Sequence, residues 1–131
     1  MDHRVQWGGD PEDIYVQAYG KATLAGLDAM TQEALADPRF RPGMKILLDY
    51  ALLDWSGMSA QDVRARAAAA VRIGRQLGDA RIAIIVGRPV EFGVGRMAQA
   101  YTEESLAAEI GLFYSAEEAR EWLRNERDQA G

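Results

Sequence analysis

The chain has 131 residues, 48% of them hydrophobic and 27% charged, with a formal net charge of −5 and no cysteine. This length fits one domain spanning residues 1–131, and this composition excludes wholesale disorder, a disulfide scaffold and any thiolate metal site. Because acidic residues outnumber basic ones, 20 to 15, no overall positive field favours nucleic acid as a partner.

The first half of the chain predicts a β-hairpin, a helix and a buried strand. Residues 4–7 and 14–19 have strand character on either side of residues 8–11, whose glycines and proline suit a turn. Between residues 23 and 37, apolar residues recur at helical spacing after a threonine that can cap the start. Residues 44–49 form a nearly continuous apolar run, which is typical of a strand covered on both faces.

The second half of the chain alternates helices with strands. A capped helix is predicted over residues 59–77 and a second buried strand over residues 81–86. A further helix is expected over residues 94–106, and a last strand over residues 110–114. Residues 115–118, Ser-Ala-Glu-Glu, are a capping-box signature that opens the final helix.

The order of these elements predicts an α/β sandwich with a largely parallel five-stranded sheet, an N-terminal β-hairpin and four helices. The apolar runs at residues 46–48 and 82–86 are expected to be adjacent central strands, because only strands covered on both faces are apolar throughout. Small residues line one stripe of the helix between them, among them Ala67 and Ala70, so this helix is expected to lie close to the sheet.

Several stretches of the chain resemble a known fold in their order and spacing. They are Gly20 before the first helix, residues 43–49, residues 80–86, residues 92–97 with Tyr101, and Phe113 with residues 117–123. This pattern is similar to the SpoIIAA-like fold shared by STAS domains and, more distantly, by CRAL-TRIO lipid carriers. More narrowly, it resembles the small stand-alone bacterial SpoIIAA-like proteins. The resemblance implies the fold and does not by itself imply a function.

One loop resembles the phosphorylated motif of the anti-sigma-factor antagonists, which are STAS proteins. In that family an Asp-Ser-Ser-Gly or Asp-Ser-Thr-Gly sequence contains the modified hydroxyl, and Asp54, Ser56 and Gly57 match it here. The resemblance implies Ser56 as the phosphorylation site. Trp55 stands where the family has a hydroxyl residue, and a large indole there would hinder a kinase, so we expect Ser56 to stay unmodified.

The predicted binding site lies at the C-terminal ends of the two central strands, where loops leaving a parallel sheet in opposite directions open a crevice. Glycine amides at a helix start can hold an anion there, and an arginine can add a bidentate contact. Two arginines on one wall and aromatic residues on the other favour a small anion with an apolar portion. The predicted ligand-binding residues are Asp49, Tyr50, Asp54, Trp55, Arg88, Phe92, Gly93, Gly95 and Arg96.

Other groups of side chains leave alternatives open. Arg64, Arg72 and Arg75 lie within about a quarter turn of one another on a helix, so they either meet an acidic partner or form a solvated face. Asp49 and Asp54 have the chemistry to hold Mg²⁺, but no lysine or histidine lies near them in sequence to complete a mechanism. Six aromatic residues either pack in the core or line a ligand pocket: Tyr15, Tyr19, Tyr50, Trp55, Phe92 and Tyr101.

These observations predict a non-catalytic binding or regulatory module that acts through a protein partner or a small ligand, because no acid, base and nucleophile converge in the sequence. No cofactor or metal is expected, the partner is a protein or a small molecule of unknown identity, and the sequence leaves a homodimer open. The alternative function is a carrier of a lipid-like or other apolar ligand, which an enclosed, aromatic-lined cavity would indicate. The third candidate function is an anti-sigma-factor antagonist that is switched by phosphorylation.

The cellular location is also predicted from the sequence. The first twenty residues contain charged side chains and no apolar stretch, so we expect no signal peptide. An apolar run of the length of residues 82–86 is too short to cross a bilayer. We therefore expect a cytoplasmic protein that does not insert into a membrane.

Overall fold

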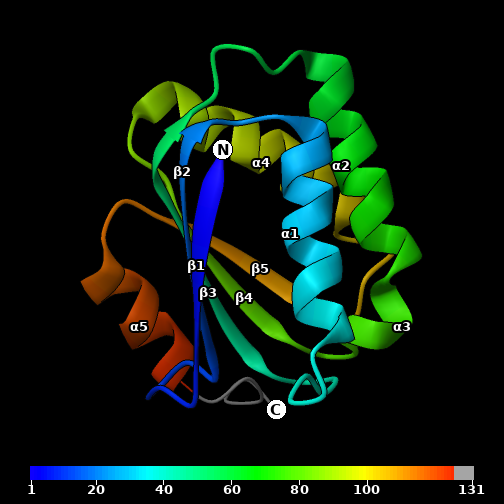
Figure 1. Ribbon diagram of the computed structural model, residues 1–131, viewed down its shortest axis with the longest axis vertical. Coiled ribbons are helices and arrows are strands. Elements are labelled where there is room, and N and C mark those ends of the chain that lie inside the picture. The colour runs from blue at the N-terminus through cyan, green and yellow to red at the C-terminus, as the bar shows by residue number, and fades with distance from the viewer. Residues whose placement is uncertain (126–131) are drawn as a thin grey trace.

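The computed structural model describes residues 1–125, which form a five-stranded sheet with helices on both of its faces (Figure 1). The strands lie in the order β1-β2-β3-β4-β5, with β1 antiparallel to β2 and every other neighbouring pair parallel. This arrangement confirms the predicted α/β sandwich, its hairpin and the pairing of its two apolar strands, β3 and β4. The strands are β1 (Asp2–Trp7), β2 (Ile14–Lys21), β3 (Lys45–Asp54), β4 (Arg81–Ile85) and β5 (Glu109–Phe113).

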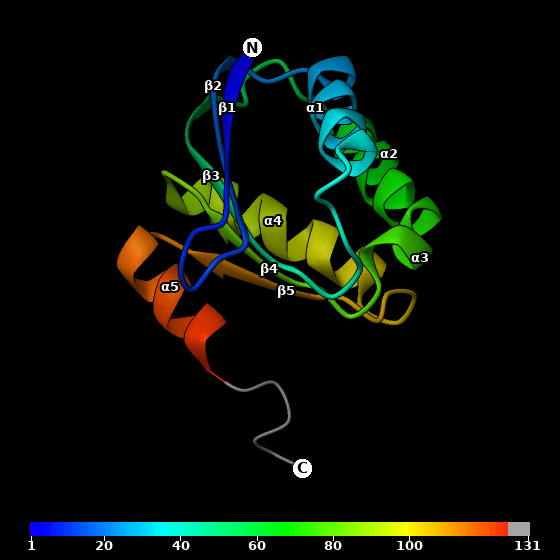
Figure 2. The ribbon, with the colours of Figure 1, turned by 60° about the horizontal axis from the view of Figure 1, so that its bottom comes forward.

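The helices divide unequally between the two faces of the sheet (Figure 2). Helices α1, α2 and α4 cover one face, which we call the three-helix face, and α5 covers the other, the α5 face. None of the described helices is long and apolar enough to span a membrane. The helices are α1 (Leu24–Ala36), α2 (Ala60–Arg72), α3 (Gly74–Leu77), α4 (Pro89–Thr102) and α5 (Ala116–Arg124).

Capping contacts set three helix starts where the sequence predicts them. Thr23 caps α1 through its side-chain oxygen, and α2 begins with reciprocal hydrogen bonds between Ser59 and Asp62. Ser115 caps α5 by accepting from the backbone N–H of Glu118 (3.2 Å), and its hydroxyl donates to the Glu118 carboxylate (3.1 Å). Each cap accepts from a backbone N–H that has no partner inside the first helical turn, which is why these side chains stabilise the start.

Two predicted helices have different boundaries in the structure. The helix expected over residues 59–77 is divided at Ile73 into α2 and the short α3, since the following Gly74 weakens the helix there, and the domain has five described helices instead of four. The helix expected over residues 94–106 begins at Pro89 and ends at Thr102. Proline is pre-organised for the first helical position, and this favours the earlier start.

Strand β3 is longer than predicted. It does not end at Asp49 but continues to Asp54, and its second half pairs with residues 19–21 of β2. This partner lies far away in sequence and satisfies backbone groups that a loop would leave to water. A register shift between Gln17 and Tyr19 accommodates the longer pairing.

Candidate functional site

The predicted site residues on β3 point to different faces of the sheet. Asp49 lies on the α5 face, where its carboxylate accepts a hydrogen bond from the Tyr15 hydroxyl (2.8 Å). The next residue, Tyr50, is buried on the three-helix face. Because side chains alternate along a strand, these two neighbours do not share one site.

The predicted site residues on α4 do not form an anion site at a helix start. Gly93 and Gly95 lie inside α4, where the helix itself takes up their backbone amides. Arg96 is exposed in the middle of the helix, and Phe92 stacks on Tyr114 with ring centroids 5.0 Å apart. The premise that these glycines open a helix is therefore wrong, because the helix begins at the earlier proline.

Polar side chains at the strand ends stabilise the local backbone. Arg88 donates a hydrogen bond to Glu91 (2.8 Å), and the buried Glu91 also accepts from the backbone N–H of Gly87 (3.1 Å). Asp54 accepts from the backbone N–H of Ser56 (2.9 Å). The hydrogen bonds from Ser56, and then the charges of nearby cations, lower the pKa of Asp54. The exposed Ser56 thus lies in a loop that Asp54 holds in place.

An apolar cavity of about 600 Å³ lies between the sheet and helices α1, α2 and α4. Leu48 and Ile84 contribute to it from the strands, and Leu27 and Met30 contribute from α1. Sequence reasoning placed Tyr50 and Trp55 in a binding site but missed the aliphatic wall from α1, because an apolar helical stripe usually indicates core packing. Of the predicted site residues, those that line the cavity are Tyr50, Trp55, Ser56, Arg88 and Gly95.

Small side chains on α2 help to create this volume. Ala67 and Ala70 both line the cavity, although their size predicts close packing of α2 on the sheet. In the structure α2 packs mainly against α1 and α4, so it stays away from the strands. The short alanine side chains then leave space between the helix and the sheet, and the prediction of close contact is wrong.

Trp55 follows β3 and brings a hydrogen-bond donor to the cavity. Its side chain lines the cavity, and its indole Nε1 is buried without an acceptor in the part of the chain that the structure describes. Its ring meets Tyr50 edge to face, with centroids 5.7 Å apart. Burial raises the pKa of the Tyr50 hydroxyl, against the smaller effect of Arg66, so this phenol is neutral at physiological pH.

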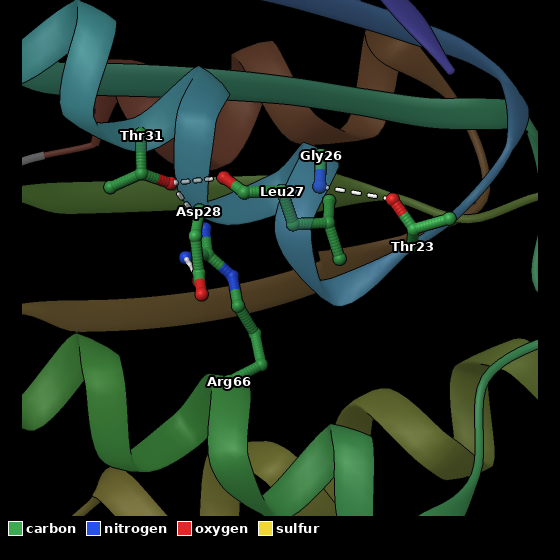
Figure 3. A network of polar contacts seen from close by, with 6 residues as sticks. All are labelled: Thr23, Gly26, Leu27, Asp28, Thr31 and Arg66. Carbon is green, nitrogen blue, oxygen red and sulfur yellow. Dashed lines mark hydrogen bonds and ion pairs between the residues drawn. The ribbon is translucent and has the colours of Figure 1, made fainter.

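Arg66 joins α2 to α1 beside the cavity (Figure 3). Its guanidinium forms an ion pair with Asp28 (3.3 Å) and donates a hydrogen bond to the Thr31 hydroxyl (2.5 Å). Thr31 in turn donates to the backbone carbonyl of Leu27 (2.9 Å). Since Arg66, Thr31 and Leu27 all line the cavity, this network fixes the position of two of its walls.

The chemistry of the cavity suits the binding of apolar surface. Its lining consists mainly of aliphatic and aromatic side chains, with a few polar groups. Residues 1–125 contain no group of three or more His, Cys, Asp or Glu side chains that would hold a metal ion. Removal of apolar surface from water is therefore the main interaction that this site offers to a ligand.

Comparison with known proteins supports the fold. No protein-family profile matches the chain, and no curated protein matches it in sequence. The structure is similar to that of an uncharacterised protein of the DUF3478 family from Shewanella loihica PV-4, described as having a SpoIIAA-like fold. The TM-score is 0.60, with 22% sequence identity over 92% of this chain and 93% of that chain. At this identity the similarity establishes architecture and not activity. The chain is therefore a small protein with the SpoIIAA-like fold, as the order of its elements predicted.

Proposed function

We propose that this protein binds an elongated, largely apolar small molecule in the cavity of the three-helix face, as a carrier and not as an enzyme. The observation that supports this proposal is the cavity itself. Its volume of about 600 Å³ falls within the range of about 300–1,000 Å³ usual for ligand pockets. The aromatic pair Tyr50 and Trp55 contributes to the lining, as expected for a carrier, and the cavity is partly open to the surface instead of enclosed.

The hydrophobic effect supplies the affinity in this proposal. Each methylene group removed from water contributes about 0.8 kcal/mol, so a chain of about ten such groups gains about 8 kcal/mol. Loss of translational and rotational freedom on association offsets several kcal/mol of that gain. The expected dissociation constant for a medium-length acyl chain is therefore on the order of micromolar to millimolar.

The buried indole of Trp55 indicates that one end of the ligand has a hydrogen-bond acceptor. A buried N–H without an acceptor costs about 1–3 kcal/mol, and a carbonyl or carboxylate oxygen of the ligand would remove that cost. The neutral hydroxyl of Tyr50, on the adjacent ring, can contribute a second polar contact. The ligand class is thus a fatty acid or a similar acyl compound, with its polar end near Trp55.

A competition assay in solution, without lipid vesicles, tests the proposal. A fluorescent fatty acid is bound to the protein, and dodecanoic acid or dodecanol is added to displace it. Replacing Ala67→Leu fills part of the cavity, so we expect it to weaken binding at least about tenfold. Ala68→Leu is the matched control, because Ala68 is exposed and does not line the cavity. Equal affinity in both variants, or no displacement by either compound, would contradict the proposal.

A second pair of variants tests the hydrogen bond. Trp55→Phe keeps an aromatic ring and removes the donor, so we expect about a tenfold loss of affinity for dodecanoic acid. Trp7→Phe is the control, because Trp7 lies on β1 beneath the Arg39 guanidinium and does not line the cavity. If Trp55→Phe bound dodecanoic acid as tightly as the parent, the Trp55 indole would not donate a hydrogen bond to the ligand, and only the apolar contacts of the cavity would support binding.

The strand-end site for a small anion is the less favoured proposal. Arg88 is already paired with Glu91, and Arg96 does not line the cavity. Regulation through phosphorylated Ser56 also has no supporting contact, so we keep the expectation that Ser56 is unmodified. Mass spectrometry of the protein from its native cells tests this, and stoichiometric phosphate on Ser56 would favour the antagonist function instead.

A further inference from the structure

Helix α4 exposes an apolar stripe that continues into the cavity. Val90, Val94, Met97 and Tyr101 follow one another at spacings of four, three and four residues, which places them on one side of the helix. They are between 38% and 63% exposed, and all four also line the cavity. Side chains that belong both to the surface and to the cavity mark its mouth.

The neighbouring side of α2 adds further apolar and cationic side chains. Helical geometry places Arg64 and Val71 on the side of α2 opposite Arg66, which contacts α1, and α2 also packs against α4. Arg72 and Arg75, also exposed, follow where α2 meets α3. The exposed set, which we call the mouth surface, comprises Val71, Val90, Val94, Met97, Tyr101, Arg64, Arg72 and Arg75.

The mouth surface is cationic on a protein that is acidic as a whole. Its charged members are the three exposed arginines Arg64, Arg72 and Arg75, whereas the whole chain has a net charge of −5. Glu91 is buried against Arg88 and contributes little negative charge to the surface. The charge distribution therefore concentrates positive charge beside the exposed apolar stripe.

We propose that the mouth surface docks on an anionic lipid bilayer, where the cavity takes up or releases its ligand; this inference rests on the proposed function. Exposed aliphatic and aromatic side chains can enter the interfacial region of a bilayer, and flanking arginines attract anionic headgroups. An apolar ligand then moves between bilayer and cavity without crossing water.

A second copy of the chain is a less suitable partner for this surface. A symmetric dimer through the mouth surface would bring the arginines of one copy close to those of the other, which is unfavourable. An anionic bilayer instead matches both the charge and the apolar character of the surface. Docking of this kind needs no membrane-spanning helix.

Flotation of the purified full-length protein with lipid vesicles tests the docking. We expect binding to vesicles in which about a third of the phosphatidylcholine is replaced by phosphatidylglycerol, and weakened binding at high salt. Vesicles of phosphatidylcholine alone should bind at least about tenfold less protein. Equal binding to both vesicle types, or no binding to either, would overturn the inference.

Matched variants locate the surface that binds. Val94→Ser combined with Met97→Ser should abolish flotation, whereas Leu52→Ser, at a residue 62% exposed outside the mouth surface, should not. Because the replaced side chains are exposed, we expect both variant proteins to be folded and to melt at about the temperature of the parent. Equal flotation of the double variant and the parent would overturn the inference.

A pair of charge variants separates local from overall electrostatics. Arg72→Gln with Arg75→Gln, and Arg4→Gln with Arg124→Gln, change the net charge equally. Only the first pair lies in the mouth surface, so we expect it to weaken binding to anionic vesicles about tenfold and the second pair to have little effect. Equal weakening by both pairs would show that net charge alone governs binding, and would overturn the inference.

Two further outcomes distinguish this inference from the proposed function. Displacement of the fluorescent fatty acid without vesicle flotation would overturn the docking and support the cavity. Flotation that depends on the mouth surface, without displacement, would support the docking and contradict the cavity. A dimer in solution that dissociates on Val94→Ser with Met97→Ser would identify a second copy as the occupant and overturn the docking.

Discussion

The two faces of the sheet bury their side chains in different ways. On the α5 face, Leu47 and Ala83 of the strands meet Leu123 of α5, and all three are 0% exposed. On the three-helix face, Leu48 and Ile84 line the cavity. The α5 face is thus a packed core, whereas the three-helix face has a buried cluster that includes Ile14, Leu27 and Met30 and also leaves space for a ligand.

Charged side chains also tie α5 to the rest of the domain. Arg120 donates hydrogen bonds to both carboxylate oxygens of Glu12, the closest at 3.0 Å, and Glu12 is buried. Arg81 donates to the backbone carbonyl of Trp122 (2.8 Å), and its guanidinium lies 4.0 Å from the centroid of that ring. These contacts anchor α5 to the hairpin loop and to β4, so the α5 face is held by both apolar and polar contacts.

The largest expected effect compares adjacent residues on the two faces. Leu47→Ala removes a fully buried side chain from the packed core, and we expect the free energy of unfolding to fall by about 3 kcal/mol. Leu48→Ala removes a side chain that borders the cavity, where a smaller loss of about 1 kcal/mol is expected because fewer contacts disappear. Urea denaturation measures both values, and equal losses would contradict the comparison.

The ion pair that anchors α5 gives the next largest effect. Arg120→Ala leaves the buried carboxylate of Glu12 without its partner, and we expect a loss of roughly 2 kcal/mol, moderated by the partial exposure of Arg120. Arg124→Ala, at the exposed end of the same helix, serves as the control and should have the stability of the parent. A parent-like urea midpoint for Arg120→Ala would show that the pair does not stabilise the α5 face.

A hydroxyl on the α5 face makes stability depend on alkaline pH. Burial, and then the hydrogen bond to Asp49, raise the pKa of Tyr15 to about 12 in the folded protein, above its usual value of about 10. Folding therefore favours the neutral phenol, whose stabilisation is complete below about pH 10 and is lost as the pH rises toward about 12.

Tyr15→Phe isolates this hydroxyl. At about pH 8 we expect it to be less stable than the parent by about 1 kcal/mol, the usual value of one hydrogen bond. At about pH 11.5 the difference should shrink, because only the parent has the phenol to ionise. Urea denaturation at both pH values measures the difference in stability between Tyr15→Phe and the parent. If that difference were the same at both pH values, ionisation of Tyr15 would not be the cause of the loss of stability at alkaline pH.

The smallest expected effect lies in α4, at the border of the cavity. Gly93→Ala should raise stability by about 0.5–1 kcal/mol, because alanine favours the helix and its methyl group would meet no atom within 4 Å. At Gly95 the added methyl group would lie 2.9 Å from Leu112, so Gly95→Ala should gain less or lose stability. Thermal melting compares the two, and an equal gain would show that Leu112 leaves room for a methyl group beneath α4.

Local signals in the sequence predicted much of the fold. The caps at Thr23, Ser59 and Ser115 and the apolar runs of β3 and β4 each arise from contacts near in sequence or from burial on both faces. The end of β3 was missed because its pairing with Gly20 depends on a distant strand. The start of α4 was missed because glycines reduce helix propensity, and the proline outweighs them.

The candidate site was less predictable than the fold. Tyr50 and Trp55 were identified because aromatic residues follow an apolar strand, and both line the cavity. The cavity itself depends on the distance between α2 and the sheet, which is set by packing against two other helices. A stripe such as Ala67 and Ala70 has the same spacing whether a helix lies on the sheet or above a cavity. Sequence spacing therefore does not distinguish the two.

The most direct test of the account is a methyl NMR titration of the labelled protein with dodecanoic acid. We predict chemical-shift changes at Leu48 and Ile84 on the three-helix face, while Leu47 and Leu123 on the α5 face stay unchanged. The adjacent pair Leu47 and Leu48 provides the internal control, since the two are leucines on opposite faces of the same strand. Changes limited to the α5 face, or no changes at saturating ligand, would contradict the central claim that the three-helix face contains a binding site.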